Sequence, residues 1–164
     1  MRFEIRPATR SDAVSMVDLL NPIIEAGNQT VMDQQVTSED QASFISQFPT
    51  QGIFLVAVAV GGYELFGMQD VIPHPSNSGP LTGEISTFVS QERQGLGVGR
   101  ALMMQTLEFA KAKGYQKLIA TIRMDNNLAQ AYYRAQGFKV VGRTSKPGGK
   151  GEIEQIVTEL ELGQ

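Results

Sequence analysis

Cysteine and tryptophan are absent from the 164 residues of this chain, and histidine occurs once. Without cysteine the protein can form neither a disulfide framework nor a thiolate metal site, and it has no cysteine nucleophile. The single histidine, His74, stands between two prolines and has no second histidine at metal-ligand spacing. We therefore expect His74 to lie on the surface and the protein to hold no metal.

Clustered positive charge and long apolar runs are lacking as well. The formal net charge is -3 and no run of lysine or arginine occurs, so the chain offers no basic field to a nucleic acid. Its longest apolar run, residues 53–60, is too short to cross a bilayer. Residues 1–10 alternate polar and apolar side chains, unlike a signal peptide. We expect a cytoplasmic protein that binds neither nucleic acid nor a membrane.

The residues that are present suit a single domain spanning 1–164, because 41% of them are apolar, enough to bury one core. Hydrophobic periodicity predicts a mixed α/β (α+β) fold without a repeat or a linker. Polar residues 21–37 are expected to shape a pocket. The predicted strands are 3–7, 53–60, 63–72, 84–90, 117–123, 138–143 and 153–160, and the predicted helices begin at Ser11-Asp12, at Thr37 or Ser38, at Gly97 and at Asn127.

The most informative segment is a glycine-rich stretch between a predicted strand and a predicted helix. It reads Gln94-Gly95-Leu96-Gly97-Val98-Gly99-Arg100. Glycine has no Cβ, so the backbone there can approach a ligand closely. Free N–H groups at the start of a helix point outward with the positive end of the helix dipole, and they bind anionic oxygens without a metal. The stretch therefore predicts a diphosphate site.

Several ligands share this chemistry, and glycines also mark turns that bind nothing. No Gly-Lys-Ser/Thr follows the glycines, which excludes a P-loop for nucleoside triphosphates. A dinucleotide site would find a ribose-binding acid in Asp125 after the next predicted strand, but Arg100 stands where its third glycine is required. A NAD-binding domain is therefore the weaker alternative.

Companion residues favour a different ligand. Asn127, Tyr133 and Gly137-Phe138 follow the glycines at fixed offsets. In this order they resemble the GCN5-related N-acetyltransferase (GNAT) family, and the resemblance spans nearly the whole chain, from Arg6-Pro7-Ala8 to about Leu160. Such a resemblance implies a central, mostly antiparallel sheet with splayed strands flanked by helices, and acetyl-CoA as the cosubstrate.

Two further segments are similar to the phosphinothricin acetyltransferase branch of that family. They are Asn21-Pro22-Ile23-Ile24 and Glu84-Ile85-Ser86-Thr87-Phe88-Val89. The chain departs from the branch in having no tryptophan, so the substrate does not follow from the resemblance. The residues that the resemblance assigns to acetyl-CoA are Phe88, Val89, Gln94, Gly95, Leu96, Gly97, Val98, Gly99, Arg100, Asn127 and Tyr133.

Catalytic roles are also implied by the resemblance. Tyr133 would be the general acid for the departing thiolate, because a phenol can donate a proton as charge develops on sulfur. Neighbouring Tyr132 competes for this role but does not fit the offset to Gly137-Phe138. Glu84 would be the general base, acting directly or through water, and the Val89 N–H would polarise the thioester carbonyl.

The function implied is an acetyl-CoA-dependent N-acetyltransferase. It would pass an acetyl group by direct attack to the primary amine of a small amino-acid-like molecule, of the phosphinothricin or methionine sulfone type. Two alternatives stay open: a protein or peptide N-terminal or lysine acetyltransferase, and a non-catalytic acetyl-CoA-binding module. Gln29, Glu25 and Asp33 are open candidates for binding the amine. Similar proteins pair through strands near the C-terminus, which implies a homodimer.

Overall fold

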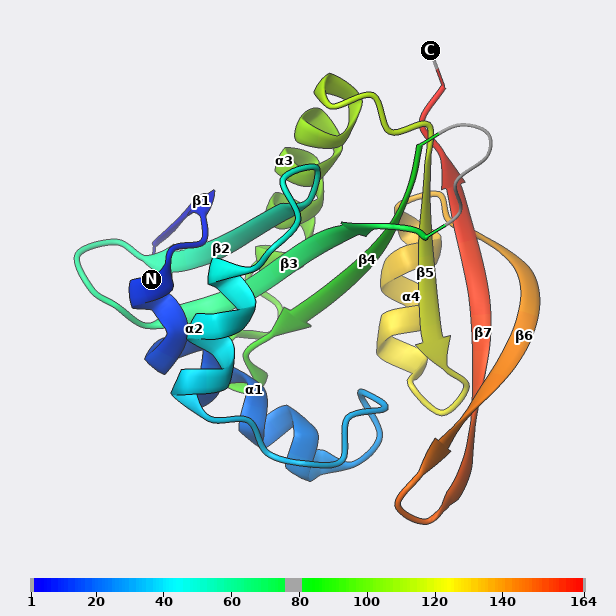
Figure 1. Cartoon of the computed structure of the whole chain (residues 1–164), viewed down its shortest axis with the longest axis horizontal. Helices are drawn as coiled ribbons and strands as arrows, with labels where there is room; N and C mark the ends of the chain where they lie inside the picture. The colour runs from blue at the N-terminus through cyan, green and yellow to red at the C-terminus, as the bar shows by residue number, and fades with distance from the viewer. Residues whose placement is uncertain (1, 76–80, 164) are drawn as a thin grey trace.

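A computed structural model describes residues 2–75 and 81–163 (Figure 1). They form a seven-stranded sheet in the order β1-β2-β3-β4-β5-β7-β6, with helices on both faces. β4 and β5 run parallel, whereas the other neighbouring pairs are antiparallel. The predicted mixed fold with a mostly antiparallel sheet is thereby confirmed. The strands are β1 (Phe3–Pro7), β2 (Ile53–Ala59), β3 (Leu65–Pro73), β4 (Thr82–Val89), β5 (Lys117–Arg123), β6 (Lys139–Gly148) and β7 (Gly151–Glu161).

Four α-helices are described, with short 3-10 turns at Arg10–Asp12 and Gln91–Arg93. None of the described helices combines the length and apolar character that crossing a membrane requires. Their bounds are α1 (Ala13–Ala26), α2 (Ser38–Ser46), α3 (Val98–Ala112) and α4 (Asn127–Ala135).

The two faces of the sheet carry separate cores because successive side chains of a strand point to opposite faces. In β2, Leu55 and Ala57 pack with α3 residues, while Val56 and Val58 pack with α1 residues. The cluster on the α3 face also includes Tyr133 of α4. Side chains near the middle of β3 and β4 therefore meet α3 and α4 on one face and α1 on the other.

The sheet splits between β4 and β5. Their pairing in the described chain runs from Thr82–Lys117 to Glu84–Ile119. Beyond these residues the two strands diverge, and the α1–α2 connection lies near the open end of the split (Figure 1). The predicted splay is confirmed, and it exposes backbone groups of the second half of β4 that a neighbouring strand would otherwise occupy.

Helix α1 is longer than the sequence pattern predicted, since it continues to Ala26 through Pro22. Proline removes one backbone donor and disfavours a helix interior. The helix continues because Ile23 and Ile24 are buried against the sheet. The polar, pocket-shaping segment is therefore 27–37, which the Asn21 side chain ties to α1 by bonds to the Val36 N–H (2.9 Å) and carbonyl (3.1 Å).

Candidate active site

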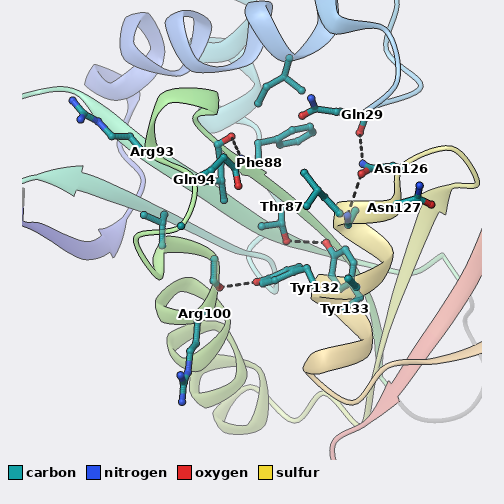
Figure 2. Close-up of a pocket in the computed structure, with 18 of the residues that line it drawn as sticks. Gln29, Thr87, Phe88, Arg93, Gln94, Arg100, Asn126, Asn127, Tyr132 and Tyr133 are labelled. Carbon is teal, nitrogen blue, oxygen red and sulfur yellow. Dashed lines mark hydrogen bonds between the residues drawn. The ribbon is translucent and has the colours of Figure 1, made fainter.

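A cavity of about 590 Å³ lies between the end of β4, the start of α3 and the start of α4. It is lined by ten of the eleven residues that the sequence assigned to acetyl-CoA. The remaining one, Leu96, stands between two lining glycines with its side chain 46% exposed. Residues from four separate segments thus converge on one cavity, as Figure 2 shows.

The cradle predicted for a diphosphate is present at the N-terminus of α3. Gly95 and Gly97 have φ angles of 79° and 81°, a left-handed backbone that favours glycine. No described atom lies within 4 Å of the position that a Cβ would take at either glycine. Gly97 is the N-cap and brings no capping side chain, so the first N–H groups of α3 are left to a ligand. The cradle fits an anionic diphosphate.

The third glycine of the stretch, which also lines the cavity, serves helix packing as well. A Cβ on Gly99 would lie 2.9 Å from Cε1 of Tyr132, which is too close for carbon atoms. The Tyr132 hydroxyl also donates to the Gly99 carbonyl at 2.6 Å. Gly99 therefore allows α3 and α4 to meet, a role that the sequence did not reveal.

A chain of hydrogen bonds connects this helix contact to Tyr133, and Figure 2 shows its last bond, between Thr87 and Tyr133. Gln69 Nε2 donates to the Tyr132 hydroxyl (3.1 Å) and to Thr87 Oγ1 (2.9 Å). Thr87 Oγ1 lies 2.8 Å from the Tyr133 hydroxyl. Because Thr87 accepts from Gln69, its own proton is available for the Tyr133 oxygen. In that arrangement the Tyr133 proton is free to be donated elsewhere.

The two tyrosines differ in the use of their hydroxyls. The Tyr132 hydroxyl donates its proton to the Gly99 carbonyl. The Tyr133 hydroxyl contacts only the Thr87 hydroxyl among the described polar groups. Tyr133 is 5% exposed. Burial raises its pKa, although the Thr87 hydrogen bond acts in the opposite direction. Tyr133 therefore keeps its proton at neutral pH, as a general acid requires.

The backbone of Val89 faces the split in the sheet. The next N–H, that of Ser90, donates to the Phe66 carbonyl on β3 at 2.9 Å. Neighbouring N–H groups of a strand point to opposite sides, so the Val89 N–H points toward β5, which has diverged. The Val89 carbonyl on the same side accepts from Gln94 Nε2 at 3.3 Å. This is where an extended acyl arm can pair with the strand.

Asn127 lines the cavity, but its neighbour Asn126 caps the helix. Asn126 Oδ1 accepts from the Ala129 N–H (3.0 Å), and its Nδ2 donates to the Gln29 carbonyl (3.4 Å). Asn127 itself is the first residue of α4, as predicted, and is exposed. Asn126 instead ties the α1–α2 connection to the cavity, a role the sequence did not reveal.

Arginine side chains contribute little to the cradle. Arg93 forms a bidentate ion pair with Glu64 (2.8 Å for each bond) and lies over the Phe66 ring. The Arg100 side chain extends away from the two tyrosines (Figure 2). Arg100 therefore lines the cavity mainly through its backbone.

Glu84 lies apart from Tyr133. It points to the face of β4 opposite Thr87 and precedes it by three residues, about 10 Å along a strand. Its side chain is 54% exposed and lies 3.5 Å from His74 Nε2. His74 is thus next to a predicted catalytic carboxylate, a contact not expected from its place between two prolines.

Comparisons with known proteins identify the family of this chain. The model of the acetyltransferase (GNAT) family matches residues 16–138. A phosphinothricin N-acetyltransferase from Streptomyces viridochromogenes is 26% identical over 148 residues, which cover 90% of this chain and 80% of that protein. An L-methionine sulfoximine/L-methionine sulfone acetyltransferase from Pseudomonas aeruginosa is 28% identical over 158 residues, which cover 92% and 88%.

Solved structures show the same fold. A GNAT superfamily phosphinothricin acetyltransferase from Sinorhizobium meliloti, in complex with AcCoA, has a TM-score of 0.83 and 22% identity over 99% of this chain and 90% of that one. The resemblance noted in the sequence is confirmed by the family match and the named relatives. The chain belongs to the acetyltransferase (GNAT) family and is an acetyl-CoA-dependent N-acetyltransferase.

Proposed function

We propose that this enzyme acetylates the primary amine of a small amino-acid-like molecule, of the phosphinothricin or methionine sulfone type. The observation that carries the proposal is one cavity with an anion cradle at α3 and the buried hydroxyl of Tyr133. A diphosphate carrier and a leaving group that needs a proton require these two features. The names of the two curated relatives support the class of acceptor.

Acetyl-CoA, when bound, supplies an acetyl thioester for the amine to attack. Backbone N–H groups of residues 98–100 hold its diphosphate, with Gln94 and Asn127 beside it. The Val89 N–H donates to the acetyl oxygen, where negative charge develops. Tyr133 gives its proton to the departing sulfur, and the Thr87 hydroxyl then donates to the phenolate oxygen. The direct attack would form the C–N bond and a tetrahedral intermediate first, and the C–S bond would then break.

The acceptor reaches the first cavity through a second one of about 840 Å³, which adjoins it at Asp125. Carboxylates outnumber cations in its lining, so it suits a positively charged amine. The Arg123 guanidinium is already bonded to Asp125 and to the Thr30 carbonyl. The charged residues that line this second cavity are Glu25, Asp33, Asp125, Glu152, Glu154, Arg123 and Lys150.

Ligand-dependent stabilisation tests the choice of carrier. Acetyl-CoA is expected to raise the melting temperature, because a ligand stabilises the folded state by about 2.7 kcal/mol at a hundred times its Kd. NAD is expected to leave it unchanged. A free-thiol assay with phosphinothricin, methionine sulfone, free amino acids and short peptides then identifies the acceptor. Stabilisation by NAD alone would refute the cradle assignment, and turnover with peptides alone would refute the small acceptor.

Glu84 is proposed to carry the acceptor's proton toward solvent through water, since it lies too far along β4 to reach the amine directly. Replacing it by glutamine is expected to lower kcat/KM by about tenfold and to flatten the acidic limb of its pH profile. The fold should be unaffected, because the side chain is more than half exposed. An unaltered acidic limb in the Glu84→Gln enzyme would remove Glu84 from the mechanism.

We further propose a cytoplasmic homodimer. The dimer contact is placed on β6, the edge strand of the sheet, where Val140 and Val141 are 64% and 56% exposed. Light scattering is expected to give twice the monomer mass, and Val141→Lys should give a monomer. Val60→Lys is the matched control, because Val60 is 57% exposed but lies after β2. If Val141→Lys and Val60→Lys have the same mass in light scattering, the dimer contact does not lie on β6.

A further inference from the structure

A carboxyl group in the middle of the sheet, on β3, has one buried oxygen without a hydrogen-bond partner among the described residues. Asp70 is in register with Ser86 of β4. Its Oδ1 is inaccessible to solvent and has no hydrogen-bond partner among the described residues, although the residue as a whole is only half buried. A buried polar group is normally paired, because leaving it unpaired costs free energy. Asp70 therefore needs an explanation outside the fold itself.

Among the described residues, no lysine or arginine forms an ion pair with Asp70. On the same face of the sheet lie Glu84 and His74, which contact each other, and the Tyr133 hydroxyl is on the opposite face. Within the described chain, α1 and α2 bury only apolar side chains and Gln41, and their acids, Asp18, Glu25, Glu39 and Asp40, are exposed. Burial alone raises the pKa of Asp70 to about 7.

Asp70 does not itself line the cavity, but its diagonal neighbour on β4 does. It shares a face with Phe88, which lines the cavity together with Ile23 of α1. Diagonal neighbours on paired strands are about 7–8 Å apart, and Phe88 is the diagonal neighbour of Asp70. Gln69, the preceding residue, is opposite Thr87, which contacts Tyr133. Asp70 and Tyr133 thus approach the same part of β4 from opposite faces.

We propose that Asp70 receives the ammonium group of the acceptor and removes one of its protons. This inference rests on the proposed function and names a residue for its acceptor side. An N–H bond of the ammonium breaks, an O–H bond forms on the Asp70 carboxylate, and the lone pair left on nitrogen attacks the acetyl carbon. In a site of low dielectric constant, a neutral acid beside a neutral amine is favoured over two buried charges. The proton then leaves through water and Glu84.

The kinetic test compares Asp70→Asn with Glu84→Gln. Asparagine keeps the shape of the side chain and removes the charge, so the variant should fold and bind acetyl-CoA like the unchanged enzyme. Its kcat/KM for the amine is expected to fall about 30-fold or more. The acidic limb of the pH profile of kcat/KM, near neutral pH, should disappear. Glu84→Gln leaves the Asp70 carboxyl in place and should therefore flatten that limb only in part. Full activity and an unchanged pH profile in Asp70→Asn would overturn the assignment.

A binding test works without a known acceptor. Methylammonium chloride is the probe, and tetramethylammonium chloride, which cannot donate a hydrogen bond, is its control. At pH 8, where Asp70 is ionised, methylammonium is expected to raise the melting temperature of the unchanged protein in the presence of CoA. Asp70→Asn should show no such rise. Equal rises in both proteins, or a rise in neither, would overturn the assignment.

Stability against pH provides a further readout. The pKa of Asp70 is raised in the folded state, so its favourable contribution is present in acid and is lost as the pH rises toward 7. The melting temperature of Asp70→Asn should therefore rise relative to that of the unchanged protein as the pH is raised from 5 to 8. A constant difference would show that Asp70 carries no uncompensated charge. If the enzyme transfers acetyl to no amine, the proposed function fails, while these two measurements still decide the role of Asp70.

Discussion

Replacing Tyr133 by phenylalanine is expected to lower kcat by about 100- to 10,000-fold, the usual contribution of a general acid. The ring stays, so the contact with Phe138 and the apolar core are preserved. Only the hydroxyl is lost, and with it the proton for the departing sulfur. Acetyl-CoA affinity should change little because the cradle lies at α3. The measurement is steady-state release of free thiol, together with thermal stabilisation by acetyl-CoA.

Tyr132→Phe is the matched control for this prediction. It removes a neighbouring hydroxyl of the same helix, but one whose proton is donated to the Gly99 carbonyl. Burial raises the pKa of Tyr132 to about 12, and its removal should lower stability by about 1 kcal/mol through the lost hydrogen bond. Turnover should fall far less than in Tyr133→Phe. A larger loss of kcat in the Tyr132 variant would exchange the roles of the two tyrosines.

Local sequence patterns predicted the parts of this site that depend on local structure. Gly95 and Gly97 mark left-handed backbone before α3. Tyr133 stands about one helical turn before Gly137, which follows the end of α4. Nothing beyond neighbouring residues is needed to recognise such signals. The boundaries of α3 and β5 were predicted to within about one residue for the same reason.

Residues whose position depends on strand register were not predicted. Gln69 and Asp70 belong to β3, and only the pairing of β3 with β4 places them beside Thr87 and Ser86. A shift of register by one residue would exchange their faces, so the sequence of β3 by itself does not show which side chain meets α4. Asn126 was passed over for a related reason, since two adjacent asparagines are equally good caps until the helix start is known.

Replacing Gly97 by valine is expected to weaken acetyl-CoA binding by at least about 100-fold, roughly 2.7 kcal/mol. Two effects combine. A β-branched residue at a φ of 81° is strained, and the relief of this strain turns the peptide groups that start α3. The branched side chain also fills space in which no described atom lies within 4 Å of the Cβ position, among the donors meant for the diphosphate. Titration calorimetry with acetyl-CoA measures the loss.

The same strain can be introduced where no ligand is expected. Gly61, in the turn after β2, has a φ of 81° and no described atom within 4 Å of its Cβ position. Gly61→Val should therefore cost about the same folding stability as Gly97→Val, about 1–3 kcal/mol, while keeping its affinity for acetyl-CoA. Equal losses of affinity in the two variants would mean that strain anywhere in the fold disturbs the site. Full affinity in Gly97→Val would mean that the diphosphate is held by groups other than the N-terminus of α3.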